Sequence, residues 1–336
     1  MIRKMHSTFL SADGITNIHV VTYLPNPKYC LFPEGMEETD GVPRAILQIA
    51  HGMTEHIERY DTFAKYMANR GILVVGHDML GHGMSVEEPE DMDLYGYFTP
   101  NDPNRVLLED IYQLMQDMKK RYPSVPYVLM GHSFGSFLAR QFMFDYPGMA
   151  DGVIVMGTGM PGRIPVRFMK ILLGILGRVQ GERHHSKLVT RMIFGPYEKA
   201  FPEDKTGFGW LTKEDDIVNA YVADPRCGFV FTVNGYKAMF EGIGRLQKKH
   251  NLKMMQKELP VLIISGEDDP VGNKGRAPKK IARSFRKLGM EHVTLRLFLG
   301  DRHEVLSEAD RELVFYYLYR WMKREHLVSV LPSQEN

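Results

Sequence analysis

Short, continuously apolar runs alternate along this chain with longer segments in which apolar residues recur every three or four positions. The runs lie at 45–50, 72–75, 127–130, 153–156, 261–264 and 293–299. A strand that is apolar on both sides has to be covered on both faces, and intervening amphipathic helices provide that cover. The expected fold class is therefore α/β, with a mostly parallel central sheet flanked by helices.

The segments between these runs predict helices with recognisable ends. Apolar residues fall at helical spacing within 55–70, and Gly71 stands where a C-terminal cap is expected. Pro103 begins a long amphipathic segment that stops before Pro123. The remaining predicted elements are helices at 136–146, 279–288 and 312–323, an N-terminal pair of strands within 8–23, and a long loop over 25–43.

One long segment interrupts the alternation of strands and helices. From 159 to 257 no such alternation is recognisable, and residues 168–176 are unusually apolar. The predicted organisation is a first part of the core over 1–158, an insertion over 159–257 and a second part of the core over 258–336. Ligands of α/β proteins bind beyond the carboxyl ends of the strands, so the insertion is expected to form a cap over an active site.

Composition excludes several classes of protein. The formal net charge of +1 gives no bulk attraction to nucleic acid, and no nucleic-acid partner is expected. Two cysteines, Cys30 and Cys227, are too few for a disulfide framework, and the N-terminus lacks an apolar segment of signal-peptide length. The apolar run 171–176 is too short to cross a bilayer, so a cytoplasmic protein is expected. The 22 methionines suit core filling or an adaptable ligand surface.

The sequence Gly131-His132-Ser133-Phe134-Gly135 matches the Gly-x-Ser-x-Gly pattern of a nucleophile elbow. Alone, the pattern is a weak signal. Its context strengthens it, because a predicted strand precedes it and a predicted helix follows it, which is the strand–turn–helix arrangement that exposes the serine hydroxyl. A side chain at either glycine would collide with the neighbouring strand or helix. Ser133 is therefore the candidate nucleophile.

A nucleophilic serine needs a base, and the base needs a carboxylate that orients it. In this type of enzyme the order along the chain is serine, acid, histidine, with each residue on a loop after a strand. His303 follows the last predicted strand, whereas His292 precedes that strand and His250 lies in the insertion. His303 is therefore the candidate base.

The acid is expected after the run 261–264, where Asp268 and Asp269 stand side by side. Pro270 restricts the backbone of Asp269 to an extended conformation, which favours Asp269 over Asp268. Asp301 is a distant third choice.

An oxyanion hole needs two backbone N–H groups, each contributing roughly 3 kcal/mol to lowering the barrier. Phe134, directly after the nucleophile, is expected to supply one. The loop after the run 45–50 is expected to supply the other, and Met53 is the preferred residue in it.

Four spaced motifs together resemble one branch of the α/β-hydrolase superfamily. They are His51-Gly52-Met53-Thr54-Glu55-His56 followed by Arg59-Tyr60, His77-Asp78-Met79-Leu80-Gly81-His82-Gly83-Met84-Ser85, Gly131-His132-Ser133-Phe134-Gly135, and Asp269-Pro270-Val271-Gly272. The set is similar to the monoacylglycerol lipase and lysophospholipase-like group, which some schemes place with the serine aminopeptidases. The resemblance spans roughly residues 8–320.

The resemblance implies an α/β-hydrolase fold, a small-molecule acyl ester as substrate and no cofactor. Monoacylglycerols, lysophospholipids and simpler acyl esters are the implied substrate classes. It also implies Asp269 as the acid and Met53 and Phe134 as oxyanion donors. Two features depart from the group's pattern: the loop 25–43 is longer, and a phenylalanine follows Ser133 where methionine is more usual.

Three alternatives have to be weighed against a lipid esterase. The same catalytic machinery cleaves amides, and Glu182, Glu203 or Asp204 could hold a free amino terminus in a peptidase. A non-catalytic ligand-binding protein could keep the same fold. The paired histidines 51/56 and 77/82 with Asp78 could suggest a metal, but their spacing is poor for a single helical face, and no metal is expected.

Residues 171–176 could touch a membrane surface transiently.

Overall fold

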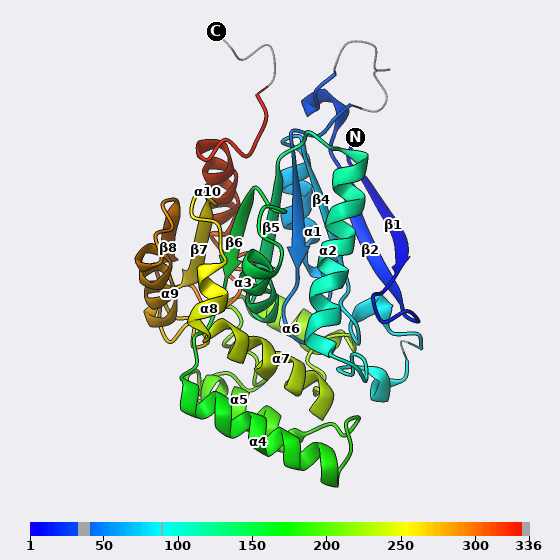
Figure 1. Cartoon of the computed structure of the whole chain (residues 1–336), viewed down its shortest axis with the longest axis vertical. Helices are drawn as coiled ribbons and strands as arrows, with labels where there is room; N and C mark the ends of the chain where they lie inside the picture. The colour runs from blue at the N-terminus through cyan, green and yellow to red at the C-terminus, as the bar shows by residue number, and fades with distance from the viewer. Residues whose placement is uncertain (33–40, 89, 331–336) are drawn as a thin grey trace.

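The computed structural model describes residues 1–32, 41–88 and 90–330, and its central feature is an eight-stranded sheet (Figure 1). The strands lie in the order β1-β2-β4-β3-β5-β6-β7-β8. β1 and β2 pair antiparallel with each other, β2 pairs antiparallel with β4, and all other neighbours are parallel. The predicted α/β class with a mostly parallel sheet is confirmed. The bounds are β1 Arg3–Leu10, β2 Asn17–Leu24, β3 Ala45–Ala50, β4 Ile72–His77, β5 Tyr127–His132, β6 Gly152–Met156, β7 Val261–Gly266 and β8 Val293–Phe298.

Helices cover both faces of this sheet, as the continuously apolar strands require. In β3, Ile46 and Ala50 belong to one hydrophobic cluster, and Leu47 and Ile49 belong to a second cluster on the opposite face. The first cluster is completed by α2 (Pro103–Arg121), α3 (Phe134–Asp145) and α9 (Arg276–Lys287), and the second by α1 (Asp61–Ala68) and α10 (Arg311–Arg324). The sheet therefore separates two cores and holds the loops at its carboxyl edge in fixed positions.

The prediction of a helix over 55–70 is wrong for its first residues. A short 3-10 segment, Ile57–Tyr60, precedes α1, and His56 has an extended backbone. The reason is tertiary contact, because the Glu55 carboxylate accepts a hydrogen bond from the Gly52 N–H and so holds the segment before α1 in a loop. The predicted start of α2 at Pro103 is confirmed. Gly71, expected as the C-terminal cap of the preceding helix, lies two residues beyond the actual C-cap, Asn69, and has a left-handed backbone with φ +81°.

The interruption of the sequence pattern contains helices that the pattern did not resolve. They are α4 (Arg163–Val179), α5 (Lys187–Glu198), α6 (Asp215–Ala223), α7 (Val233–Leu246) and α8 (Lys249–Lys253). Figure 1 shows α4, α5 and α7 beyond the end of the sheet where the parallel strands finish. α7 packs on both α3 and α4, so it joins this layer to the core. The division of the chain at 159 and 257 stays a prediction.

Among the helices in the described ranges, none combines the length and the apolarity that a bilayer crossing requires.

A buried carboxylate ties the N-terminal strands to α2. Asp110 is fully buried on α2, and it accepts hydrogen bonds from the Ser11 hydroxyl at 2.9 Å and from the Ala12 N–H at 2.7 Å. Burial raises the pKa of Asp110 to about 7, against the lowering effect of these hydrogen bonds. The carboxyl group thus binds a proton more tightly in the folded chain than in the unfolded chain.

This difference predicts a pH-dependent stability. The contribution of Asp110 is largest below its unfolded pKa of about 3.9 and is lost as the pH rises through about 7. Asp110→Asn, which keeps an acceptor oxygen, should therefore gain stability relative to the parent chain between pH 5 and pH 8. Thermal unfolding at several pH values measures this, with the exposed Asp117→Asn on the same helix as control. A stability difference that does not change with pH would contradict it.

Candidate active site

Ser133 lies on the sharp turn between β5 and α3. Its backbone has φ +50° and ψ −114°, a conformation that is strained for a residue with a side chain. The two glycines of the motif make the turn possible. A Cβ at Gly131 would lie 2.2 Å from the carbonyl oxygen of Gly135, and a Cβ at Gly135 would lie 2.1 Å from that of Ala50. The first turn of α3 therefore packs directly against the carboxyl end of β3.

His303 and Asp269 meet in the loops that follow β8 and β7. The Nδ1 atom of His303 lies 3.0 Å from Oδ1 of Asp269, and both side chains are buried. Asp269 also accepts hydrogen bonds from the Ser265 hydroxyl at 3.0 Å and from the Val271 N–H at 2.8 Å. These bonds fix the carboxylate, which in turn fixes the orientation of the imidazole ring.

The electrostatics of Asp269 favour its charged form. Burial by itself would raise the pKa of this carboxyl, but the charge of His303 and the surrounding hydrogen bonds together lower it below its ordinary value. The neighbouring Asp268 is only partly buried, and its N–H donates to the Asp301 carbonyl. The Asp301 carboxylate lies 3.3 Å from Lys213 Nζ. Of the three candidate acids, the geometry brings Asp269 to His303.

The other ring nitrogen of His303 is free to act on a substrate. Nε2 is buried and has no hydrogen-bond partner among the described residues. The ring is held between the Trp210 ring, with centroids 5.1 Å apart, and the His132 ring, with centroids 4.8 Å apart. His303 and Ser133 line the same cavity.

The loop after β3 brings Met53 to this cavity in a fixed conformation. Thr54 has φ +56°, and its N–H donates to His82 Nε2 at 3.3 Å. His51 contacts the Gly52 carbonyl through Nδ1, and its Nε2 accepts from the Met79 N–H. One histidine of each sequence pair, His51 and His82, thus supports this loop. Across 1–32, 41–88 and 90–330, the N–H groups of Met53 and Phe134 donate to no other group.

The side chain of Phe134 is buried in an aromatic cluster. It is 2% exposed and stacks on Phe98, with ring centroids 6.1 Å apart, and it packs edge-on against Phe231 at the same centroid distance. The phenylalanine that departs from the usual methionine is therefore part of an aromatic cluster that joins α3 to the segment before α7.

A buried charge network beside the site was not assigned by sequence reasoning. Glu55 accepts hydrogen bonds from Gly52 N–H and from Tyr60 OH, and it lies 3.1 Å from Nδ1 of His132. Arg59 bridges Glu55 to Glu304, the residue after His303. Burial would raise the pKa of Glu55, but His132 and Arg59 lower it well below its usual range. The only signal in the sequence was the position of Glu55 and Arg59 inside a recognised motif.

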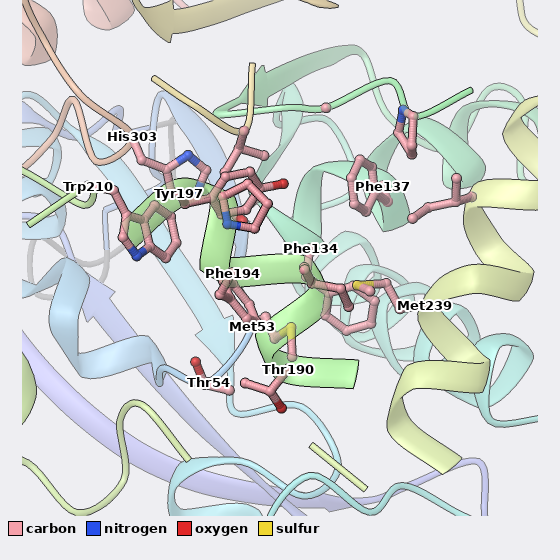
Figure 2. A pocket seen from close by; sticks show the side chains of 18 of the residues that line it. Met53, Thr54, Phe134, Phe137, Thr190, Phe194, Tyr197, Trp210, Met239 and His303 are labelled. Atoms are coloured by element: carbon pink, nitrogen blue, oxygen red, sulfur yellow. The ribbon is translucent and has the colours of Figure 1, made fainter. Parts of the chain in front are cut away.

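The cavity beside Ser133 has a volume of about 750 Å³, within the usual range for ligand sites (Figure 2). Figure 2 shows His303 beside Trp210 and Tyr197 at one side, with Met53, Phe134 and Met239 gathered at another. Most of the wall is apolar, and five methionines contribute to it: Met53, Met160, Met169, Met192 and Met239. The layer of helices beyond the end of the sheet, α4, α5 and α7, supplies much of this wall.

A cluster of three side chains that could bind a metal ion lies outside the wall of the cavity beside Ser133. In the described part of the chain, His56, Asp224 and Cys227 place one ligand atom each within 4.8 Å of one another. Arg226 forms a bidentate ion pair with the Asp224 carboxylate, with Nε 3.1 Å from Oδ1 and Nη2 2.9 Å from Oδ2. The cluster is therefore built as a charge network, and the expectation that the protein needs no metal stays a prediction.

The sheet order, the elbow and the paired histidine and aspartate define an α/β hydrolase. Residues 41–310 match the family model described as serine aminopeptidase, S33. The chain is 35% identical to a monoglyceride lipase homolog of Monkeypox virus, over 80% of this chain and 84% of the viral protein. It is 33% identical to the monoglyceride lipase of Homo sapiens, over 84% of each chain.

A solved structure agrees on the fold. A thermostable carboxyl esterase from Bacillus coagulans superposes with a TM-score of 0.82 at 23% identity, covering 96% of this chain and 98% of the esterase. The chain belongs to the serine aminopeptidase S33 family of α/β hydrolases. The resemblance to the monoacylglycerol lipase-like branch is thereby confirmed.

Proposed function

We propose that this carboxylic ester hydrolase cleaves monoacylglycerols through an acyl-enzyme on Ser133. One observation carries the proposal: Ser133, His303 and the residues Met53 and Phe134, whose N–H groups are uncommitted, line a single cavity with a mostly apolar wall, and Asp269 is paired with His303 behind that wall. The monoglyceride lipase names of the human and viral relatives support the choice of substrate.

The chemistry follows from the roles of these groups. Ser133 Oγ attacks the ester carbonyl carbon while His303 Nε2 takes the hydroxyl proton, and Asp269 stabilises the resulting imidazolium. The N–H groups of Met53 and Phe134 donate to the oxyanion of the tetrahedral intermediate. The C–O bond to glycerol then breaks, and His303 returns the proton to the leaving oxygen. Water repeats the sequence on the acyl-enzyme and releases the fatty acid.

The wall of the cavity suits one acyl chain and a small polar head. Phe137, Met169 and Ile243 supply apolar surface from α3, α4 and α7, in keeping with an aliphatic chain. Thr54 and Tyr221 add polar groups to the same cavity. The Tyr221 hydroxyl donates to the Thr54 carbonyl and accepts from the Gly228 N–H, so the Thr54 hydroxyl, 2.9 Å from that of Tyr221, is the group that can accept a hydrogen bond from a substrate hydroxyl. The segment 159–257, which contributes α4 and α7, acts in this proposal as the cap that encloses the chain.

The first test is ester turnover over a series of chain lengths. The parent chain should hydrolyse monoacylglycerols and p-nitrophenyl esters of medium or long chains in preference to acetate, and a fluorophosphonate should label Ser133. Ser133→Ala should lower turnover by roughly four to six orders of magnitude without loss of folding, whereas Ser284→Ala on α9 should not change it. Preference for acetate would favour a small-ester esterase, and faster cleavage of an aminoacyl amide would favour a peptidase. Retained activity in Ser133→Ala would exclude this nucleophile.

The second test separates the two adjacent aspartates. Asp269→Asn removes the charge that stabilises the imidazolium and should lower kcat by about 10⁴-fold, because the imidazole is then held in the wrong tautomer. Asp268→Asn is the matched control and should stay within a few fold of the parent chain. Steady-state kinetics on one soluble ester decides between them. Equal losses in the two variants would contradict the assignment of Asp269.

We also propose that α4 contacts a membrane surface to collect substrate. Of the apolar run 171–176, Leu173 is buried against the core, but Ile171 and Ile175 are 57% and 52% exposed. They continue an apolar row on α4 with Ile164 and Phe168. Such a row favours partial insertion into the boundary between head groups and acyl chains.

Ile171→Ser/Ile175→Ser should lower binding to phosphatidylcholine vesicles by about tenfold or more, because two apolar side chains no longer leave water. Leu10→Ser/Leu313→Ser, which alters similarly exposed residues outside the cap, is the matched control. Vesicle flotation measures binding, and equal binding by both double variants would contradict the proposal.

The cytoplasmic location stays a prediction. Cys30 and Cys227 are both buried free thiols, which supports a reducing compartment.

A further inference from the structure

A shallow groove of about 410 Å³ runs between α4 and α7, apart from the candidate active site. On the α4 side the groove is lined by three cations, Arg163, Arg167 and Lys170, with Val166 and Ile171 at its apolar margins. On the other side it is lined by Gly244 of α7 and by Gln247, the C-cap residue of that helix. It shares no lining residue with the cavity beside Ser133. Three cations in one groove make it a candidate site for an anion.

The groove lies at the edge of the apolar row of α4. Helical spacing divides α4 into three stripes. Val166, Met169 and Leu173 form a stripe that is buried towards the core. Ile164, Phe168, Ile171 and Ile175 form the exposed apolar stripe. Arg163, Arg167 and Lys170 form the stripe between these two, on the side that faces the groove. If the apolar stripe meets a membrane, the cationic stripe lies at the depth of the head groups.

The charges of this stripe are only partly neutralised. α4 contains no acidic residue. Lys170 pairs with Glu241, but neither Arg163 nor Arg167 forms an ion pair with any carboxylate in the described ranges. Arg163 donates through Nη2 to the Gln247 carbonyl at 3.2 Å, which holds that guanidinium at the edge of the groove. Two positive charges are therefore available to a ligand.

We propose that this groove binds the phosphate of an anionic phospholipid in the membrane on which α4 rests. Guanidinium groups match phosphate oxygens with paired N–H donors, so two neighbouring arginines suit a phosphodiester. Gly244 contributes no side chain to the opposite wall, and a Cβ there would lie at an ordinary contact distance of 3.8 Å from Lys170 Nζ, so a longer side chain at this position would extend into the groove. The inference rests on the proposed membrane contact of α4 and is independent of the proposed ester chemistry.

Binding of the full chain to two kinds of vesicle tests the proposal. One kind contains phosphatidylcholine alone, and the other contains phosphatidylcholine with phosphatidylglycerol. The parent chain should prefer the anionic vesicles, and Arg163→Gln/Arg167→Gln should lose about 30-fold in affinity for them, as expected for two cations at a membrane surface. Lys199→Gln/Lys205→Gln removes the same charge from exposed positions away from α4 and outside the groove, and it should lose less than about fivefold.

A second variant tests the groove without changing charge. Gly244→Leu fills the open wall and should lower binding to anionic vesicles while leaving binding to phosphatidylcholine unchanged. Hydrolysis of a water-soluble p-nitrophenyl ester should stay at the parent rate in all these variants, so a failed ester assay would count against the catalytic proposal alone. Equal losses in the groove and control double variants, or no preference of the parent chain for anionic vesicles, would overturn the groove as a phosphate site.

Discussion

The close approach of α3 to the end of β3 is the constraint on which the rest of the site depends. Because Gly135 has no side chain, its Cα can lie against the carbonyl oxygens of Ala50 and His51. That contact sets the N-terminus of α3 beside the loop that begins at His51, and so places the N–H groups of Phe134 and Met53 around one cavity. The strained backbone of Ser133 persists because packing on both sides of the turn holds it.

Around this contact, buried polar groups connect loops that are far apart in the sequence. The Glu55 carboxylate accepts a hydrogen bond from the Gly52 N–H and lies 3.1 Å from His132 Nδ1. Arg59 forms ion pairs with both Glu55 and Glu304, the residue after His303. Gly52, Glu55 and Arg59 lie in the segment after β3, His132 lies at the end of β5, and Glu304 lies in the loop after β8, all at the carboxyl edge of the sheet. A charge buried in this way is costly unless every partner is in place, so the network favours a single arrangement of the three loops.

Much of the core and of the site geometry could be predicted from local patterns. The apolar runs predicted the parallel strands, and the placing of His303 after the last strand predicted its meeting with Asp269. The first turn of the helix at 55–70 could not be predicted, since the contact between Glu55 and Gly52 overrides helical periodicity. The helices within 159–257 were missed because no strands alternate with them, and because α4 has apolar residues on an exposed row as well as on its buried row, which hides its period. Their apolar residues are buried against one another, against α3 and around the cavity, and not against a face of the sheet.

The methionines of the cavity wall affect how sharply the site can select among acyl chains. Five of them line the cavity, and each has an unbranched side chain that can change rotamer at little cost. A wall of this kind reshapes around its occupant instead of excluding one that is slightly too long or bent. Discrimination among acyl chains should then be gradual, with neighbouring lengths and degrees of unsaturation handled at similar rates, while the rigid loops around Ser133 keep the reaction itself unchanged.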